Sequence, residues 1–523
     1  IQTNQKSDIE VEEKKNSTSE KINIVGIYDP AKNDLSMDMW QNSNGEIILK
    51  TIEKINNINL SNDAKEILNI ALLTNSHFPE KNITREEFLK IKSDWLIKQK
   101  NLILIEEYLS KNNNLPYGDK LITYYLDYYL SHANTAKSCE IFNKADLLIN
   151  ENYLSKYKIY CLINLDKREE AQLYFDLMKE NNFEDKFFEK KFSYLMEYEE
   201  NLDNEISEKN LLDFHLSHRT NKDFNFEPKK TTPKIIWKYL SFSNLLENVD
   251  LVDLENREKL STIEMATHER NYKEEELFSL YERFQFSINQ LLNVEDSSKL
   301  LPDSESRALV YQGILITENV PKKIKLIKLL KDSFEKKGIS NAFNNKLEDF
   351  LESIDENEVP SNFSAFYNTH RKSKNVEEKK IKYNNKIIHQ SKILDYFKED
   401  SKLNNIEKVL ESILKKVKKD KKYFFSINDL IVLESLKSDG LEIPKKYENI
   451  YEKTDPNIPY DIQIFINRNE PGLVLLRLVE IIGQDKITDI DPETLYFIVS
   501  ILNQLNLDKI RNNLLLKVLP LKV

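Results

Sequence analysis

The sequence predicts an all-α protein, an irregular α-solenoid of helical hairpins similar to tetratricopeptide repeats. Glycine is scarce, with 8 residues in a chain of 523, although hairpin turns between strands and phosphate-binding loops use glycine for its positive φ angles. From Gly45 onward, apolar residues recur at helical spacing in segments separated by a few polar residues. Such short connections make neighbouring helices antiparallel.

Composition and charge narrow the classes of partner. The hydrophobic fraction of 40% supplies a core, and the charged fraction of 31% gives a polar surface. The net charge is 76 − 87 = −11, whereas a protein that embraces nucleic acid presents a basic face to the phosphates. No uninterrupted apolar run reaches the roughly 20 residues of a membrane-spanning helix. We therefore expect no nucleic acid partner and no membrane span.

The N-terminal segment is predicted to lie outside the folded body. Residues 1–23 are charged and polar without an apolar period, so we expect a disordered tether. Because the chain begins at Ile1 and not at Met, we expect that a secretory signal has been removed. The β-branched residues between Ile24 and Tyr28 predict a short strand or an extended clasp.

The N-terminal block, residues 24–200, is predicted to be an array of helical hairpins. Ser61 precedes an apolar period and is suited to cap a helix. Ala171 and Tyr174 lie at a spacing that resembles a tetratricopeptide-type hairpin, although no clean 34-residue period is present. Further helices are predicted at 84–98, 102–109, 121–130, 136–149, 153–165 and 169–179.

Two polar stretches divide the rest of the chain. The predicted order is a linker or irregular segment at 201–234, a middle helical block at 235–371, a charged connection at 372–392 and a C-terminal helical block at 393–523. Within these blocks, Gly338, Gly440 and Gly483 follow helical patterns and are expected to end helices.

The two cysteines predict a disulfide. Cys139 lies 12 residues before Glu151 and Cys161 lies 10 residues after it, on two helices joined by the turn around Glu151. The cysteines of such an antiparallel pair differ in height by about 3 Å at the helical rise of 1.5 Å per residue. A bond would stabilise the hairpin by roughly 3 kcal/mol in an oxidising compartment. The alternative is two buried free thiols that face different ways.

A histidine pair is the nearest approach to a metal site. His215 and His218 are three residues apart on a possible helix, and Asp213 lies close by. The sequence has no His-Glu-x-x-His motif and no cysteine cluster. We therefore interpret both histidines as surface residues and predict no metal ligands.

A tyrosine group is one candidate binding surface. Tyr124, Tyr125 and Tyr128 lie on one predicted helix, and exposed aromatic rings of this kind stack on the sugar rings of glycans. Packing between hairpins is the alternative interpretation.

A lysine run is the second candidate binding surface, formed by Lys415, Lys416, Lys418 and Lys419. It is suited to anionic lipid headgroups, an acidic polymer or nucleic acid. The alternative is a solvated helix C-terminus, which the helix dipole favours for cations.

Catalytic signatures are missing from the sequence. It contains no Gly-x-Ser-x-Gly elbow, no phosphate loop and no glycine-rich dinucleotide turn. Glu434-Ser435 matches the acid-serine dipeptide of lytic transglycosylases, but the glycine- and glutamine-bearing segment expected after it is replaced by residues 436–440. We therefore predict no catalytic residues, no enzyme activity and no cofactor.

Several segments together resemble a family of exported alphaproteobacterial helical-repeat proteins, some labelled antifreeze glycopeptide polyprotein. They are residues 26–30 (Gly-Ile-Tyr-Asp-Pro), Met39-Trp40, the hairpin from Cys139 to Cys161, residues 306–312 (Ser-Arg-Ala-Leu-Val-Tyr-Gln) and the helices after Pro471-Gly472. The resemblance implies an envelope-facing repeat protein without catalytic residues to carry over. This chain has Lys, Asn and Ile where that family has Ala and Pro.

The functional hypothesis is a soluble periplasmic scaffold that binds a protein or peptide partner in the bacterial envelope, because stacked helical repeats form extended binding surfaces. One alternative is an envelope glycan-binding module or enzyme, which requires a deep polar cleft with convergent carboxylates. Another alternative is a cytosolic scaffold, if Ile1 does not follow a cleaved leader.

Overall fold

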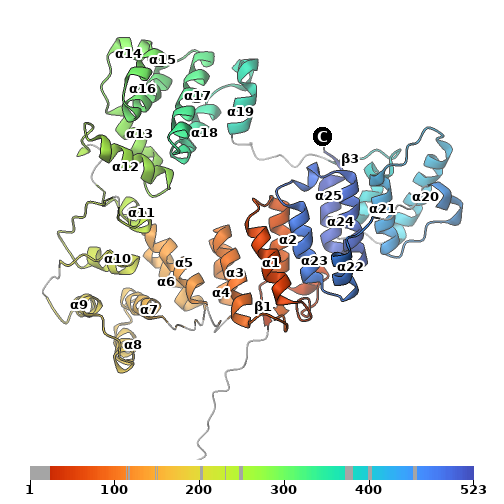
Figure 1. Cartoon of the computed structure of the whole chain (residues 1–523), viewed down its shortest axis with the longest axis horizontal. Coiled ribbons are helices and arrows are strands. Elements are labelled where there is room, and N and C mark those ends of the chain that lie inside the picture. Colours follow the sequence, from red (N-terminus) through yellow and green to blue (C-terminus); the bar gives the residue numbers. More distant parts are fainter. Residues whose placement is uncertain are drawn as a thin grey trace, which may run out of the picture. The chain divides into compact units, whose positions relative to one another are not determined.

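The described residues are mostly helical (Figure 1). The structure is a computed structural model that describes residues 24–522, except 113–114, 116–117, 146, 148, 150, 201–203, 230, 247–250, 372–380, 399–402 and 451–455. The strands of these residues are two antiparallel pairs, β1 (Ile24–Val25) with β2 (Ser76–His77) and β3 (Ile381–Lys382) with β4 (Leu521–Lys522). The predicted all-α class is confirmed. The tether predicted at residues 1–23 lies outside the described residues.

The described residues form two compact units. Residues 24–92 and 381–522 form unit 1, and residues 93–371 form unit 2. One division therefore falls near residue 92, inside the block that the sequence assigned to 24–200, and the other falls within the charged connection at 372–392. Among the described residues, no helix combines the length and the apolar content that a membrane span needs.

Unit 1 combines helices from both ends of the chain. Its helices are α1 (Gly45–Asn56), α2 (Asn62–Leu73), the first half of α3 (Arg85–Gln99), α20 (Leu403–Lys419), α21 (Ile427–Ser438), α22 (Tyr460–Asn467), α23 (Pro471–Ile482), α24 (Pro492–Gln504) and α25 (Asp508–Val518). Its 3-10 turns are η1 (Pro30–Asn33), η7 (Ile388–Gln390), η8 (Lys392–Phe397), η9 (Lys445–Ile450) and η10 (Ile487–Asp489).

Unit 2 is continuous in sequence. It contains the second half of α3, then α4 (Leu102–Lys111), α5 (Asp119–Ser131), α6 (Thr135–Lys144), α7 (Asn152–Asn164), α8 (Arg168–Glu180), α9 (Lys186–Leu195), α10 (Leu211–Arg219), α11 (Lys234–Phe242) and α12 (Arg257–His268). It continues with α13 (Glu274–Glu282), α14 (Ile288–Leu292), α15 (Val294–Ser297), η3 (Ser298–Leu300), α16 (Asp303–Ile316), α17 (Val320–Lys336), η4 (Ser340–Phe343), α18 (Asn345–Glu352), η5 (Glu356–Glu358), η6 (Ser361–Phe363) and α19 (Ser364–His370).

Local signals placed several helix ends correctly, although α6 ends at Lys144 and not at residue 149 as predicted. The Ser61 hydroxyl accepts a hydrogen bond from the Ala64 N–H at 3.2 Å, so Ser61 is the N-cap of α2 as expected. Gly338 and Gly440 follow α17 and α21 with φ angles of +76° and +89°. Glycine reaches this left-handed conformation without the steric cost that a Cβ imposes, which explains why these helices end there.

The apolar segment after residue 23 forms the predicted clasp. Ile24 and Val25 pair with Ser76 and His77, which follow α2. The Val25 carbonyl also accepts a hydrogen bond from the ammonium group of buried Lys92, with an N–O distance of 2.8 Å. The clasp therefore joins the beginning of the chain to both α2 and α3.

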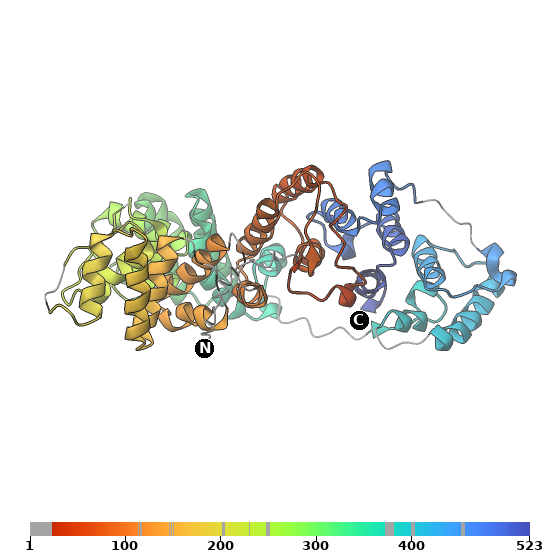
Figure 2. The same cartoon turned by 90° about the horizontal axis from the view of Figure 1, so that it is seen from below.

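A tryptophan joins the N-terminal and C-terminal segments of unit 1. Trp40 is fully buried, and its indole N–H donates to the Ala71 carbonyl of α2 at 3.2 Å. Gly472, in the first turn of α23, lies so close to the ring that an added Cβ would be 2.7 Å from indole atoms. Its N–H donates to the Met39 carbonyl at 3.3 Å. Figures 1 and 2 show the resulting arrangement, with α1 and α2 beside α23.

Unit 2 contains hairpins of consecutive helices and also contacts between helices that are distant in sequence. The pairs α5/α6, α7/α8 and α16/α17 are hairpins, whereas α5 also packs against α10 and α11. A simple row of hairpins predicts only the contacts between consecutive helices. The contacts of α5 with α10 and α11 make these three helices part of one core.

The segment predicted at 201–234 as a linker contains a core helix, so that prediction is wrong for α10. Every residue of α10 from Leu211 to Ser217 is buried. A helix buried on all sides shows no apolar stripe, because polar and apolar positions alike face neighbouring helices. The alternation of Asp213, His215 and Ser217 with apolar residues therefore gave the possible helix around His215 no sign of a core position.

Replacing Gly472 by alanine should destabilise unit 1 by about 1 to 3 kcal/mol, because the new Cβ overlaps the Trp40 ring. Helix propensity alone predicts the opposite, a gain of up to about 1 kcal/mol. Thermal unfolding followed by circular dichroism measures the difference. In a Trp40→Leu background, the same glycine substitution should cost much less, and an equal cost in both backgrounds would contradict the contact.

Candidate functional site

A cavity of unit 2, about 930 Å³ in volume, lies between the segment 225–231, α11 and α12. Its apolar lining comes from Phe226, Pro228, Trp237, Leu245, Leu246, Val252, Ile263 and Tyr272, and its polar lining comes from Asn225, Glu227, Lys229, Thr231, Asn256, Glu258, Lys259 and Thr262. An apolar interior with a few polar groups at the edge is typical of binding sites for organic ligands and peptide side chains.

One wall of the cavity follows α10, which a buried ion pair holds in place. The Lys156 ammonium group of α7 lies 2.8 Å from the Asp213 carboxylate and 3.0 Å from the Asp185 carboxylate. Lys156 and Asp213 are both almost fully buried. Breaking a buried pair of this kind leaves an uncompensated charge, which costs about 3 to 5 kcal/mol. The pair therefore fixes α10, and with it the start of the segment that lines the cavity.

The opposite wall is α12, which a second buried ion pair holds. Arg307 of α16 makes two hydrogen bonds to the Glu264 carboxylate, at 3.0 and 2.6 Å. The Tyr281 hydroxyl of α13 donates to the same carboxylate at 2.6 Å. A bidentate guanidinium–carboxylate pair with a further donor has fixed geometry. One wall of the cavity is thus a helix that the core orients rigidly, and the other is a segment that follows such a helix in sequence.

The segment 224–229 forms one edge of the cavity and has no helix or paired strand. Side-chain exposure alternates along it: Phe224, Phe226 and Pro228 are partly buried, and the residues between them are exposed. This period of two is typical of a β-strand with one covered face. Phe224 and Phe226 pack edge-to-face on Phe214 of α10, with ring centroids 5.6 and 5.0 Å apart.

The backbone of this segment is unpaired over four residues. Within the described part of the chain, the N–H groups of residues 224–227 make no hydrogen bond. Pairing resumes at Lys229, whose carbonyl accepts from the Thr232 N–H at 3.0 Å and from the Trp237 indole N–H at 3.4 Å. The segment therefore offers main-chain donors and acceptors next to an apolar cavity.

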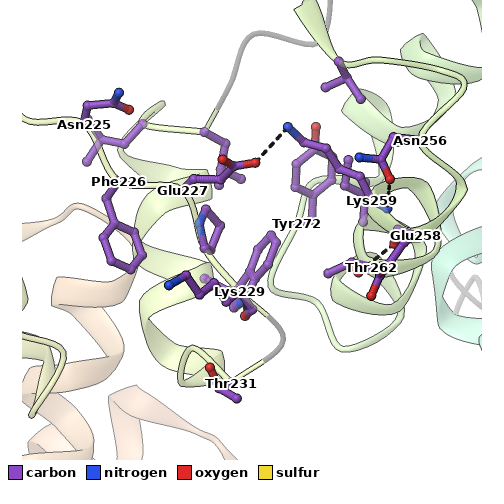
Figure 3. A pocket seen from close by; sticks show the side chains of 16 residues that line it. Asn225, Phe226, Glu227, Lys229, Thr231, Asn256, Glu258, Lys259, Thr262 and Tyr272 are labelled. Atoms are coloured by element: carbon purple, nitrogen blue, oxygen red, sulfur yellow. Dashed lines mark hydrogen bonds and ion pairs between the residues drawn. The ribbon is translucent and has the colours of Figure 1, made fainter.

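An ion pair crosses the cavity from one wall to the other. Figure 3 shows Glu227 reaching from the segment to Lys259 of α12, with an N–O distance of 3.2 Å. The Glu227 side chain is 79% exposed, so water screens this pair and it adds little stability. A ligand that enters the cavity can separate the two side chains at low cost.

The predicted tyrosine surface is only partly available. Tyr125 is fully buried, and its hydroxyl donates to the Glu106 carboxylate at 2.9 Å, so it is a packing residue and the prediction of a binding role is wrong for it. Tyr124 is half-buried, and burial raises its pKa. Tyr128 is half-buried between His132 and the Lys238 ammonium group, which lies 5.0 Å from the ring centroid.

The predicted lysine surface lies in the other unit. Lys415, Lys416, Lys418 and Lys419 are all exposed at the C-terminal end of α20. They belong to unit 1, whereas the tyrosines and the cavity belong to unit 2. The two predicted surfaces are therefore not parts of one site within a unit.

The predicted cysteine pair is a disulfide between α6 and α7. The Cα atoms of Cys139 and Cys161 are 5.4 Å apart, and both residues are buried. The bond closes a loop of 22 residues in sequence separation, for which the loop-entropy model gives a stabilisation of about 3 kcal/mol. It fixes the hairpin that carries Lys156, one of the residues that orient α10.

The histidine pair is part of a buried hydrogen-bond network and does not form a surface. His215 is buried, and its two ring nitrogens lie 2.8 Å from the Tyr239 hydroxyl and 2.7 Å from the Tyr160 hydroxyl. His218 contacts the same Tyr239 hydroxyl at 2.7 Å. The expectation of surface histidines is therefore wrong for His215. In the described residues, no group of three or more His, Cys, Asp or Glu side chains is arranged to hold a metal ion.

Sequence reasoning did not identify the segment 224–229 as a binding element, although its strand-like pattern is visible in the sequence. Phe-Asn-Phe-Glu-Pro-Lys alternates apolar and polar residues, which is the pattern of a half-buried strand. Its place in the polar stretch that includes Pro228 and Pro233 suggested a linker instead. Periodicity cannot show that a strand lacks a partner, because the pairing depends on segments elsewhere in the chain.

Comparisons with known proteins give no match: no family model, curated protein or solved structure resembles this chain closely enough to be reported.

Acid should destabilise unit 2 through His215, because burial, followed by the nearby Arg219 charge, lowers the pKa of this side chain from 6.5 to about 3. The unfolded chain binds a proton near pH 6.5, so the stability from neutral His215 is complete above that pH and is lost as the pH falls toward 3. The slope is at most about 1.4 kcal/mol per pH unit.

Urea unfolding of the wild type and of His215→Gln at a series of pH values measures this dependence. The glutamine variant should be less stable at pH 7 but should lose less stability between pH 6.5 and pH 4. The same acid dependence in both proteins would show that His215 is not the group responsible.

Proposed function

We propose that this chain is a non-catalytic α-solenoid of tetratricopeptide-like hairpins that binds an extended peptide segment of a partner protein in the cell envelope. The observation that carries the proposal is the unpaired segment 224–229 beside the cavity of unit 2. Affinity comes from main-chain hydrogen bonds, and selectivity comes from a peptide side chain that enters the cavity.

Main-chain recognition fits the geometry of the segment. A peptide that lies alongside an unpaired strand forms hydrogen bonds with its backbone, a mode known as β-augmentation. Aromatic packing on Phe214 holds the segment from its covered face and leaves Asn225 and Glu227 exposed. Because the segment is already ordered, the peptide alone bears most of the entropic cost of binding.

The cavity favours a large apolar side chain at one position of the peptide. Its volume of about 930 Å³ exceeds that of any single side chain, so the neighbouring peptide residues also enter it. The indole of Trp237 and the ring of Tyr272 supply rigid apolar surface, which commonly contributes most of the affinity at peptide sites. Lys259 and Glu227 at the mouth then meet the polar residues of the peptide.

The compartment is proposed on separate grounds. A buried disulfide between neighbouring helices is expected in an oxidising environment, since cytosolic thiols are kept reduced. The resemblance of residues 26–30, Met39-Trp40 and 306–312 to exported envelope proteins supports the same assignment. Trp40 packs against Gly472, so two of the segments that carry the resemblance meet in unit 1.

Filling the cavity should abolish peptide binding. Peptides selected from a random library against the purified full-length chain would be measured by fluorescence polarisation with the wild type and with Thr262→Trp, whose indole occupies the space between α11 and α12. We expect affinity to fall at least about tenfold, because the anchoring side chain loses its place. Thr262→Ser is the control and should bind like the wild type.

The backbone role is tested by a matched pair at an exposed position of the segment. Asn225→Pro removes one N–H donor, whereas Asn225→Ala removes the side chain and keeps that donor. Glu227→Pro and Glu227→Ala form a second pair with the same logic. Loss of affinity in proline variants alone supports β-augmentation. Equal affinity in all four variants, together with loss in Thr262→Trp, would place recognition in the cavity without strand addition.

Protein isolated from its own cells should carry the Cys139–Cys161 bond. Alkylation before and after reduction, read by mass spectrometry, should add two alkyl groups only after reduction. Two groups added without reduction would contradict the envelope assignment and would favour a cytosolic scaffold. This result does not depend on the peptide experiments, so compartment and binding are judged separately.

A further inference from the structure

The strongest local concentration of charge in the chain lies at the end of α20 and is not part of the cavity. Residues 415–422 contain six lysines and one aspartate, a net charge of 6 − 1 = +5. The whole chain carries −11, so the other 515 residues carry −11 − 5 = −16. This turn and helix end therefore carry a local net positive charge in a chain whose remainder is net negative.

The fold keeps these lysines in solvent. Ile413, Leu414 and Val417 of α20 are buried, and the lysines alternate with them on the opposite face. Lys418 donates to the Lys446 carbonyl of η9 at 2.6 Å, and Lys446 pairs with Glu411. Among the described residues, none forms an ion pair with the ammonium groups of Lys415, Lys416, Lys419, Lys421 and Lys422.

An apolar ring projects from the chain directly after the lysines. Phe424 is 85% exposed, whereas both of its neighbours are held by the core. The Tyr423 hydroxyl donates to the Asp429 carboxylate at 2.9 Å, and Phe425 packs against the core of α20 and α21. Because the residues on each side are anchored, the outward position of Phe424 is fixed by the fold.

We propose that the end of α20 docks on an anionic membrane surface, with Phe424 inserted between the lipid headgroups and the lysines in contact with their phosphates. A basic helix end with one protruding aromatic ring is the arrangement of segments that bind at the lipid–water interface. Each lysine near an anionic leaflet raises the binding constant about fivefold, and insertion of the ring raises it by roughly another factor of ten. The lysine stems also cover apolar surface while their ammonium groups reach the headgroups.

The surface fits a lipid bilayer better than a nucleic acid. Nucleic acid binders combine a basic groove with several stacking rings, whereas here one ring projects from a convex helix end. The charge of −16 on the remainder repels a long polyanion that follows the protein surface. A membrane meets Phe424 and the lysines at the end of α20, and salt screens charges more than about 8 Å away.

Vesicle co-sedimentation with the full-length chain tests the proposal. Vesicles of phosphatidylcholine alone are compared with vesicles of phosphatidylcholine and phosphatidylglycerol. The wild type should bind only the second kind, and binding should weaken as salt is added. Phe424→Ala should weaken binding about tenfold, and the triple variant Lys415→Gln, Lys416→Gln, Lys419→Gln should weaken it by roughly two orders of magnitude.

Matched controls use the other unit. Leu300 is 86% exposed, so Leu300→Ala removes an exposed apolar side chain that belongs to unit 2. The triple variant Lys322→Gln, Lys328→Gln, Lys336→Gln on α17 changes the net charge by the same amount. Both controls should bind vesicles like the wild type. If either control loses binding as strongly as the α20 variants, the effect is general and the proposal is wrong.

Insertion of the ring has its own readout. The native residues Trp40, Trp95 and Trp237 are at most 9% exposed. In the variant Phe424→Trp, brominated lipids in the anionic vesicles should therefore quench the fluorescence of the new indole. Absence of quenching, equal binding to both vesicle types, or binding to single-stranded oligonucleotides in place of anionic vesicles would each overturn the proposal. None of these outcomes bears on peptide binding by the cavity, which lies in unit 2.

Discussion

Unit 1 depends on the contact between Trp40 and Gly472. The indole fills the space where any other residue at position 472 would place a Cβ, and its N–H bonds to Ala71. Residues more than 400 positions apart are thereby joined, and α23 packs against α1 and α2. Two further contacts form because these segments lie close together, the Lys54–Glu480 ion pair and the hydrogen bond from the Ser61 N–H to the Gly483 carbonyl. They add little stability by themselves.

Unit 2 uses buried polar groups to position its helices. The Lys156–Asp213 and Arg307–Glu264 pairs fix α10 and α12, and the His215 network joins α10 to α7 and α11. Apolar contacts tolerate small shifts of a helix, whereas a buried ion pair does not, because a separated partner is left unsolvated. These pairs therefore fix α12, which lines the cavity, and α10, which precedes the segment on its other side. The unpaired segment 224–229 comes soon after α10 in the sequence, so the position of α10 determines where the segment begins.

Much of the fold was predictable, and little of the site was. Apolar spacing and caps located α2, α17 and α21 within a few residues, since those signals lie within each helix. The same reasoning allowed a helix around His215 and His218 but missed its burial, because its polar residues are satisfied by partners on other helices. Sequence reasoning also assigned Tyr125 to a surface, although this residue is buried and its hydroxyl donates a hydrogen bond to the Glu106 carboxylate. Exposure of an aromatic residue depends on which helix lies above it, and a single helical pattern does not contain that information.

The sequence by itself determined the helical class, the helix ends at Ser61, Gly338 and Gly440, and the register that allows Cys139 to meet Cys161. These features depend on residues within one hairpin, where 3.6-residue periodicity and capping fix the geometry. The tertiary structure alone decided that the chain's two ends share one unit, that His215 is buried, and that residues 224–229 border a cavity without a strand partner. Each of these depends on contacts between helices far apart in sequence, whose formation is governed by the summed burial of many side chains and not by any local pattern.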